Sequence, residues 1–291
     1  MDNCIIEIKH LKKNYGSSLG IEDVSFKINK GEIYGFIGPN GSGKSTTIRT
    51  ILGLINKTSG NVYIKGKEFN KDDIETKKVI GYLPSEINLY DDMTIKEMFD
   101  YHELFYGKHF NKRREELVKL LKIDESKKIE DLSLGNQKKV GIVLCLIHEP
   151  EILILDEPTS GLDPIMQNVL HEILLKEKEK GTTIIYSSHI LNEVSSLCDR
   201  VGFIKEGIII KEDLIDNIMK DSYTYLSISS KDIKQIKKDL GLKVIRESKD
   251  EATFINNIDS NTLIKKLAKY NIDRLLIQEI SLEDLFINYY K

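Results

Sequence analysis

The feature that most constrains this sequence is a glycine-rich stretch, Gly38-Pro39-Asn40-Gly41-Ser42-Gly43-Lys44-Ser45-Thr46. It fits the pattern G-x-x-x-x-G-K-[ST] of a phosphate-binding loop. The apolar run Ile33–Ile37 before it is typical of a strand, and residues 47–52 after it place apolar side chains at helical spacing. A strand, a glycine loop and a helix in this order form the structural context that the motif requires. The sequence therefore predicts a site for a nucleoside triphosphate.

Each residue type in this loop has a physical role in holding phosphate. Glycines let the backbone bend until several N–H groups point at one anion, and the start of the helix adds the positive end of its dipole. Lys44 supplies a charge for the β- and γ-phosphates, and the hydroxyl of Ser45 is an oxygen ligand for Mg²⁺. The residues expected to bind nucleotide here are Gly38, Pro39, Asn40, Gly41, Ser42, Gly43, Lys44, Ser45 and Thr46.

A second chemical signal is the run Ile152-Leu153-Ile154-Leu155-Asp156-Glu157. A short continuous apolar run predicts a buried parallel strand, and its acids then emerge at the carboxyl end, where α/β proteins build their sites. Beside a phosphate loop, Asp156 is placed to hold Mg²⁺. Glu157 can orient and deprotonate the water that attacks the γ-phosphate. The alternative is a pair of solvated acids at the end of a strand.

Composition and charge exclude several classes of protein. The 291 residues suffice for one large domain and a small one, and a net charge of -3 gives no general attraction to nucleic acid or anionic lipid. Cys4, Cys145 and Cys198 are far apart, which argues against a zinc site or a disulfide framework and fits a reducing cytosol. The N-terminal residues lack the basic region of a signal peptide, and no apolar run approaches the ~20 residues of a membrane span. We expect any membrane role to come through a partner.

The pattern of the chain predicts two domains. Residues 1–220 read as an α/β cassette, interrupted at about 88–150 by a mainly helical subdomain. Thr94 and Glu97 form a capping box at the start of that helical region. Residues 222–291 follow the order β-α-β-β-α-β, a split βαβ pattern, and predict a small α+β domain of ferredoxin-like fold with a final helix at 281–289.

Three further motifs connect these signals to a known family. They are Leu132-Ser133-Leu134-Gly135-Asn136-Gln137, Glu157-Pro158-Thr159-Ser160-Gly161-Leu162-Asp163 and Ser187-Ser188-His189. Together with the phosphate loop, and in this order, they resemble the ATP-binding subunit of an ABC transporter over roughly residues 5–215. The resemblance implies a P-loop NTPase cassette with a mixed sheet, ATP and Mg²⁺ as cofactors, a second ATPase subunit as partner and a separate transmembrane permease.

The resemblance also assigns roles to single residues. Ser133, Gly135 and Asn136 lie in the signature motif, which in the family contacts the γ-phosphate of the ATP bound to the other subunit. Asp163 ends the loop that crosses the dimer and links the two ATP sites. A helix start carrying a hydroxyl and a glycine amide is a sensible anion site. Taken by itself, however, Ser133 fits a plain helix cap equally well.

Two more residues receive roles in the same way. His189 matches the switch histidine that contacts the γ-phosphate, and with Glu157 and Lys44 it completes the expected catalytic group. Tyr15 matches the aromatic residue that stacks on adenine. The alternatives are a structural histidine and a core aromatic at the end of a strand.

The chain departs from the family pattern at two places. Ser85, in Gly81-Tyr82-Leu83-Pro84-Ser85-Glu86, occupies the place of the usual glutamine. Its hydroxyl is expected to reach Mg²⁺ or the attacking water with a shorter side chain, and Glu86 is an alternative donor of oxygen. In the signature, Leu134 and Asn136 replace the family's glycine and glutamine. Because the phosphate loop and both acids remain, we still expect a competent ATPase.

The small C-terminal domain, with the ending Ser281-Leu282-Glu283-Asp284-Leu285-Phe286, resembles the extension on ATPases of ABC-2-type exporters. The leading interpretation is therefore an ATPase that powers export through a permease, at the inner face of the cell membrane. A soluble ABC ATPase acting on ribosomes or nucleic acid is the alternative. Such relatives tend to carry two cassettes, coiled-coil arms or cysteine clusters, which this sequence lacks, so no nucleic-acid partner is expected. Glu157 argues against a third possibility, a regulatory module without turnover. A homodimer is expected, although pairing with a similar second ATPase stays open.

Overall fold

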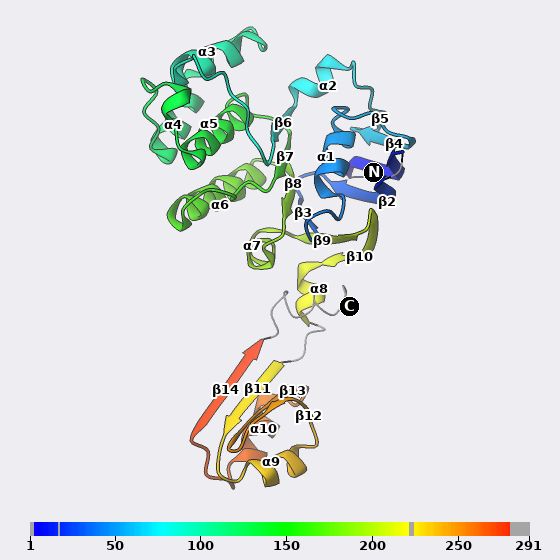
Figure 1. Cartoon of the computed structure of the whole chain (residues 1–291), viewed down its shortest axis with the longest axis vertical. Coiled ribbons are helices and arrows are strands. Elements are labelled where there is room, and N and C mark those ends of the chain that lie inside the picture. The colour runs from blue at the N-terminus through cyan, green and yellow to red at the C-terminus, as the bar shows by residue number, and fades with distance from the viewer. Residues whose placement is uncertain (1–2, 17, 221–223, 280–291) are drawn as a thin grey trace. The chain divides into compact units, whose positions relative to one another are not determined.

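The computed structural model describes residues 3–16, 18–220 and 224–279. By its internal contacts the chain divides into two compact units, Met1–Ile215 and Asp216–Lys291 (Figure 1). The helix predicted at 281–289 lies outside the described residues. No helix in the described parts of the chain is long and apolar enough to cross a membrane.

The first unit is built on one mixed sheet. Its strands are β1 (Cys4–Tyr15), β2 (Ser18–Asn29), β3 (Ile33–Ile37), β4 (Ser59–Ile64), β5 (Lys67–Glu68), β6 (Ile80–Leu83), β7 (Ile152–Asp156), β8 (Thr183–Ser188), β9 (Arg200–Lys205) and β10 (Ile208–Leu214). Within the described residues the order is β5-β4-β1-β2-β10-β9-β3-β8-β7-β6. Neighbours from β9 to β6 run parallel, whereas β1, β2, β4 and β5 form antiparallel pairs. The predicted α/β cassette with a mixed sheet is confirmed.

Helices accompany this sheet and also form a group of their own. They are α1 (Lys44–Ile51), α2 (Ile74–Lys78), α3 (Ile95–Leu104), α4 (Asn111–Leu121), α5 (Leu134–Leu146), α6 (Pro164–Glu179) and α7 (Leu191–Leu197); α8 (Ile215–Lys220) begins at the boundary between the two units. In Figure 1, α3, α4 and α5 lie together beyond β6 and β7. The predicted capping box of α3 is confirmed, because the side chain of Thr94 accepts from the backbone of Glu97 and the side chain of Glu97 accepts from the backbone of Thr94.

The parallel strands explain why distant motifs meet. Every residue of β3 and β7 is buried, as expected for apolar runs in the middle of a sheet. The pairs β3–β8 and β7–β8 are parallel and in register, so the three strands end at one edge of the sheet. The phosphate loop follows β3, Glu157 follows β7 and His189 follows β8. The fold thus collects the phosphate loop, the acids and the histidine at one place.

The first hairpin is longer than the sequence pattern predicted. The alternation of apolar and polar residues indicated short strands at 5–9 and 24–28, whereas β1 continues to Tyr15 and pairs there with Ser18 at the start of β2. The register shifts several times along this pair, and His10 has a positive φ of 49°. Bulges of this kind break the two-residue period, so the pattern hides the strand.

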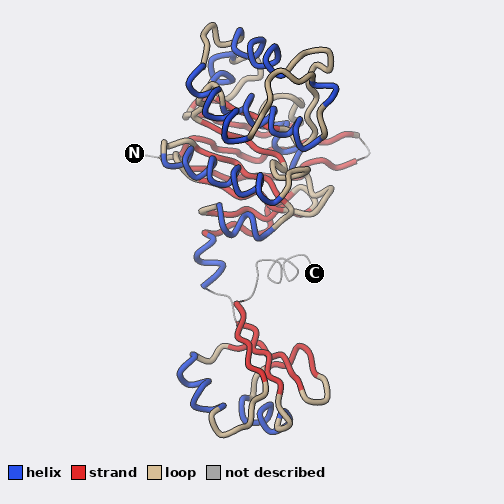
Figure 2. Tube along the Cα trace, turned by 90° about the vertical axis from the view of Figure 1, so that its left-hand side faces the viewer, coloured by secondary structure: helices blue, strands red, loops and turns tan. Residues whose placement is uncertain are grey.

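The second unit is a small antiparallel sheet covered by helices. It contains β11 (Thr224–Ser229), α9 (Ile233–Leu240), β12 (Lys243–Glu247), β13 (Glu251–Asn256), α10 (Ser260–Leu267) and β14 (Arg274–Glu279). The described strands lie in the order β12-β13-β11-β14. Leu226, Ile228 and Phe254 of the sheet share one buried core with Ile236 and Leu263 of the helices. Figure 2 shows α9 and α10 beside the strands of this unit.

Candidate functional site

The phosphate loop leads into a helix whose first turn is free of competing side chains. Gly43 caps α1 with a φ of 105° and ψ of 4°, in the left-handed region that glycine adopts without strain. No side chain caps this helix, and its first turn carries no acid. The backbone N–H groups at the start of α1 therefore keep their capacity to bind an anion, and the helix dipole favours one.

Lys44 lies almost fully buried beneath this loop. Its Nζ donates hydrogen bonds to the carbonyl oxygens of Gly38 at 2.6 Å and Pro39 at 3.3 Å, so the side chain folds back over the loop. Burial lowers the pKa of Lys44, while the nearby carboxylates of Glu157 and Asp156 act to raise it. Phosphate groups would add negative charge beside this ammonium group and favour its protonated form.

Asp156 ends β7 and is completely buried. Its Oδ1 accepts a hydrogen bond from Ser187 Oγ at 3.1 Å. Its Oδ2 has no hydrogen-bond partner among the described residues. A buried carboxylate oxygen without a partner is costly, and a hard cation would complete its surroundings.

The protein side of such a metal site would be sparse. The described residues contain no group of three or more histidine, cysteine, aspartate or glutamate side chains that could hold a metal. Mg²⁺ commonly uses one or two protein oxygens and completes its shell with water and substrate phosphates. The unpartnered oxygen of Asp156 therefore fits Mg²⁺ bound together with a nucleotide.

Glu157 turns the chain sharply away from the strand. It has a positive φ of 49°, which is uncommon for a residue with a side chain, and its N–H donates to the carbonyl oxygen of Ser187 at 3.1 Å. Its Oε1 lies 3.7 Å from Lys44 Nζ, and its Oε2 lies 3.3 Å from His189 Nδ1. The structure thus brings together the three side chains that the sequence proposed as catalytic.

The end of β8, directly before His189, is held by a buried acid, Glu193, that the sequence analysis missed. The hydroxyl of Ser188 accepts from the N–H of Ile190 at 2.9 Å and donates to Glu193 Oε2 at 3.0 Å. The hydroxyl of Tyr186 donates to the same oxygen at 2.9 Å. Glu193 thus anchors two side chains of β8, whereas the His189 side chain is 51% exposed. The signal available in the sequence was an acid in the first turn of the helix that follows His189.

Tyr15 lies at the end of β1 with 47% of its surface exposed, so it is not a core aromatic. Lys13 Nζ lies 4.7 Å from the centre of its ring. Tyr15 lines a pocket of about 370 Å³ that also reaches the phosphate loop and Glu157. The other residues around this pocket are Gly20, Asn40, Gly41, Gly43, Lys44, Ser45 and Thr46.

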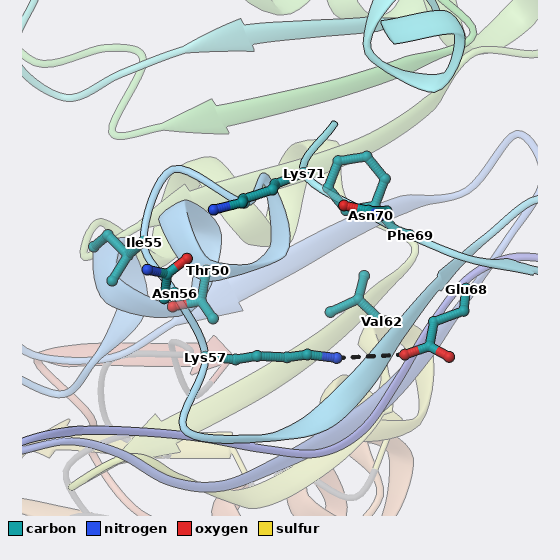
Figure 3. Close-up of a pocket in the computed structure, with 10 residues that line it drawn as sticks. Thr50, Ile55, Asn56, Lys57, Val62, Glu68, Phe69, Asn70 and Lys71 are labelled. Atoms are coloured by element: carbon teal, nitrogen blue, oxygen red, sulfur yellow. Dashed lines mark hydrogen bonds and ion pairs between the residues drawn. The ribbon is translucent and has the colours of Figure 1, made fainter. Parts of the chain in front are cut away.

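A separate pocket of about 460 Å³ lies near the end of α1 (Figure 3). It is lined by Thr50 of α1 and by residues of the segments around β4 and β5, among them Phe69 and Lys71. Lys57 and Glu68 form an ion pair of 3.5 Å across it. None of the residues predicted to bind nucleotide or metal contributes to this pocket, so it is distinct from the candidate site.

The signature residues lie outside the nucleotide pocket of their own chain. Ser133 caps α5, and its Oγ accepts from the N–H of Asn136 at 3.4 Å. Leu134 is 79% exposed. A Cβ added to Gly135 would lie 2.6 Å from the carbonyl oxygen of Gly161, so the signature rests directly on the loop that follows Glu157.

The two remaining predicted site residues have structural contacts of their own. The carboxylate of Asp163 caps α6 by accepting from the N–H of Met166 at 3.0 Å. Ser85 follows β6, and its carbonyl oxygen accepts a hydrogen bond at 3.0 Å from Lys138, a buried residue that the sequence analysis missed. No contact described for these residues reaches the pocket beside Tyr15.

A phosphate loop after β3, a buried acid at the end of β7 on the same edge of the sheet, and a mixed sheet with a group of helices define the class of ABC-type P-loop ATPases. The family described as ABC transporter matches residues 21–160. The bacitracin transport ATP-binding protein BcrA of Bacillus licheniformis is 38% identical over 234 residues, which cover 78% of this chain and 76% of that protein. This chain belongs to the ABC transporter ATP-binding family, as an ATPase subunit.

Solved structures support the same assignment. The chain resembles an ATP-binding subunit of an ABC transporter, with a TM-score of 0.73 and 25% identity, over 99% of this chain and 100% of the other. It also resembles the ATP-binding cassette MJ0796, solved as a dimer in a post-hydrolysis state with ADP and Pi. That similarity has a TM-score of 0.66 at 27% identity and covers 72% of this chain and 99% of the cassette.

Proposed function

We propose that this chain hydrolyses ATP with Mg²⁺ in order to power export through a separate transmembrane permease. The observation that carries the chemistry is the position of Glu157, between Lys44 and His189 and directly after the buried Asp156. The direction of transport rests on the resemblance of the C-terminal domain to ABC-2-type exporters, while the relative BcrA, named for bacitracin transport, supports the transport role.

We assign each residue of the pocket a separate role in hydrolysis. The N–H groups of the phosphate loop and the ammonium group of Lys44 hold the β- and γ-phosphates. Glu157 orients a water and accepts its proton, and His189 donates a hydrogen bond to the γ-phosphate. Ser45, Asp156 and Ser85 are the proposed protein oxygens for Mg²⁺. When bound, Mg²⁺ supplies positive charge that stabilises the charge developing on the phosphate oxygens.

We assign the remaining site residues to the two sides of a dimer. Tyr15 stacks on the adenine of its own nucleotide, and its exposed ring beside the phosphate loop supports this role. Ser133, Gly135 and Asn136 contact the nucleotide of the second subunit, and Asp163 lies in the loop between the sites. The exposure of Leu134 and the dimeric state of the MJ0796 cassette support a homodimer with shared sites.

The division into domains follows the proposed function. We assign residues 1–220 to the cassette, about 88–150 to a helical subdomain, and 222–291 to an accessory domain. The succession β11-α9-β12-β13-α10-β14 with strand order β12-β13-β11-β14 supports a ferredoxin-like fold for the accessory domain.

Capture of the partner tests the transport role. The tagged chain, isolated from gently solubilised native membranes, should bring down a membrane protein with several apolar spans of ~20 residues. We propose that this permease holds the chain at the inner face of the membrane. Ribosomal proteins or nucleic acid in the captured material, with no membrane protein, would instead favour the ribosome or nucleic-acid alternative. The net charge of -3 gives no general attraction to nucleic acid.

Metal removal tests the proposed Mg²⁺ site. EDTA should stop turnover, and Mg²⁺ or Mn²⁺ should restore it, because Asp156 and Ser45 offer hard oxygen ligands. Asp156→Asn should reduce turnover in the same assay without preventing ATP from reaching the phosphate loop. Full activity in EDTA, measured as phosphate release, would contradict the assignment of Asp156.

A further inference from the structure

Lys138 is a buried cation on the signature helix. It lies in α5, shortly after Ser133 and Gly135, and only 3% of its surface is exposed. Its Nζ donates to the carbonyl oxygen of Pro84 at 3.1 Å and to that of Ser85 at 3.0 Å. A lysine side chain this deeply buried is unusual, so its partners call for an explanation.

The partners of Lys138 are backbone groups. Among the described residues no carboxylate bonds to its ammonium group. Burial lowers the pKa of Lys138, and the charges of Asp156 and Glu157 act in the opposite direction. Burial of a charge is tolerated only where hydrogen bonds satisfy it. The carbonyl groups of Pro84 and Ser85 therefore hold the ammonium group, and the ammonium group in turn fixes these peptide units against α5.

A second contact joins the same loop to α5. A Cβ added to Gly141 would lie 2.4 Å from Cδ1 of Ile87, so this side chain packs directly on the helix backbone. The loop at 84–87 is thus fastened to α5 both at Lys138 and at Gly141. Because a packed interior transmits displacement, a shift of α5 would carry the loop with it.

The loop at 84–87 lies beside Asp156, the proposed ligand of Mg²⁺. Strands β6 and β7 are parallel, and Leu83 pairs with Leu155, so Pro84 and Ser85 follow at the level of Asp156. About one turn before Lys138, α5 begins with the signature, which contacts the ATP of the second subunit in the proposed dimer. One helix therefore connects a contact to the partner's nucleotide with the surroundings of this chain's own nucleotide.

We propose that Lys138 is a positioning residue that couples the two ATP sites of the dimer, by tying the Pro84–Ser85 peptide units to the signature helix. This inference rests on the proposed function, because Ser85 and the signature have their roles there. Binding of the partner's γ-phosphate to the signature sets the position of α5. Through its hydrogen bonds, Lys138 makes Ser85 follow any shift of that helix. These hydrogen bonds also account for the serine at position 85. Lys138 holds the loop by its backbone carbonyl groups, so a long side chain at this position is not needed.

The test compares Lys138→Met, which keeps the length but removes the donor, with Lys138→Gln, which restores a shorter donor. Lys139→Met on the same helix is the matched control. Loss of hydrogen bonds from a charged donor should lower kcat per bound ATP roughly ten-fold or more in Lys138→Met. The Mg²⁺ concentration for half-maximal activity should rise, ATP affinity should change less than about two-fold, and Lys138→Gln should recover part of the loss.

If Lys138 only stabilises the fold, its substitution should give different results. It would lower the melting temperature and the number of ATP-binding sites, but leave kcat per site and the Mg²⁺ requirement unchanged. That result, or wild-type kinetics in both Lys138 variants, overturns the coupling while the proposed function stands. If the wild-type chain itself shows no Mg²⁺-dependent hydrolysis, the proposed function fails and the coupling with it.

Discussion

Glu157→Gln should lower ATP hydrolysis by about 10²–10⁴-fold while ATP binding survives, because that range is the usual contribution of general acid–base catalysis. Glutamine keeps the size of the side chain and can still bond to Lys44 and His189, which lie 3.7 Å and 3.3 Å from the carboxylate. It cannot accept the proton of an attacking water. Single-turnover phosphate release and equilibrium binding of ATP, measured on the same preparation, separate the two effects.

The same variant should also change the oligomeric state. In the proposed dimer each γ-phosphate joins the phosphate loop of one subunit to Ser133 and Gly135 of the other. Without hydrolysis these contacts persist, so Glu157→Gln should accumulate as an ATP-bound dimer, while the wild type stays mostly monomeric or transiently dimeric. Light scattering with and without MgATP decides the matter. If the variant remains monomeric at saturating MgATP, one explanation is that the signature does not bind the partner's nucleotide because of Leu134 and Asn136. The other is that this chain pairs with a different ATPase.

Lys44→Ala should abolish tight binding of MgATP. Lys44 is the only cationic side chain within the phosphate loop, and its Nζ is held at the loop by the carbonyl groups of Gly38 and Pro39. Hydrogen bonds to charged groups contribute about 1.5–3 kcal/mol each, so loss of contacts to both phosphates predicts an affinity at least roughly 100-fold weaker. Titration with a fluorescent ATP analogue measures the change.

Lys57→Ala is the matched control for this experiment. Lys57 lines the separate pocket at the end of α1, and its substitution should leave ATP affinity unchanged. Should the two variants behave the other way round, the nucleotide would lie in the pocket of Figure 3 and not beside Tyr15. Equal affinity in Lys44→Ala and wild type would remove the phosphate loop from the site altogether.

Local patterns predicted those parts of the site that follow buried parallel strands. Each of β3 and β7 is an uninterrupted apolar run, and the chemistry begins where the run ends, so Lys44, Asp156 and Glu157 could be placed from the sequence. The capping box of α3 involves residues close in sequence and was predictable for the same reason. The succession of elements in the second unit was visible because their amphipathic patterns are short and regular.

Contacts between distant residues were not predictable in this way. Lys138 reads as one more charge on a helix, and only the packing of α5 against the end of β6 reveals its bonds to Pro84 and Ser85. Glu193 likewise reads as an exposed acid until Tyr186 and Ser188 are seen to bond to it. Ser133 serves as a helix cap, as its residue type alone allowed. Its contact with a nucleotide stays a prediction, because that contact requires a second chain.

The left-handed backbone at Glu157 limits the sequence changes that can silence this ATPase without damaging it. Asparagine and aspartate tolerate such a backbone better than most residues, and glycine adopts it freely, whereas β-branched side chains are strongly disfavoured there. A valine at this position would therefore disturb the turn as well as remove the base. Inactive descendants of this lineage that keep a sound fold should accordingly carry glycine or an amide side chain at the position of Glu157.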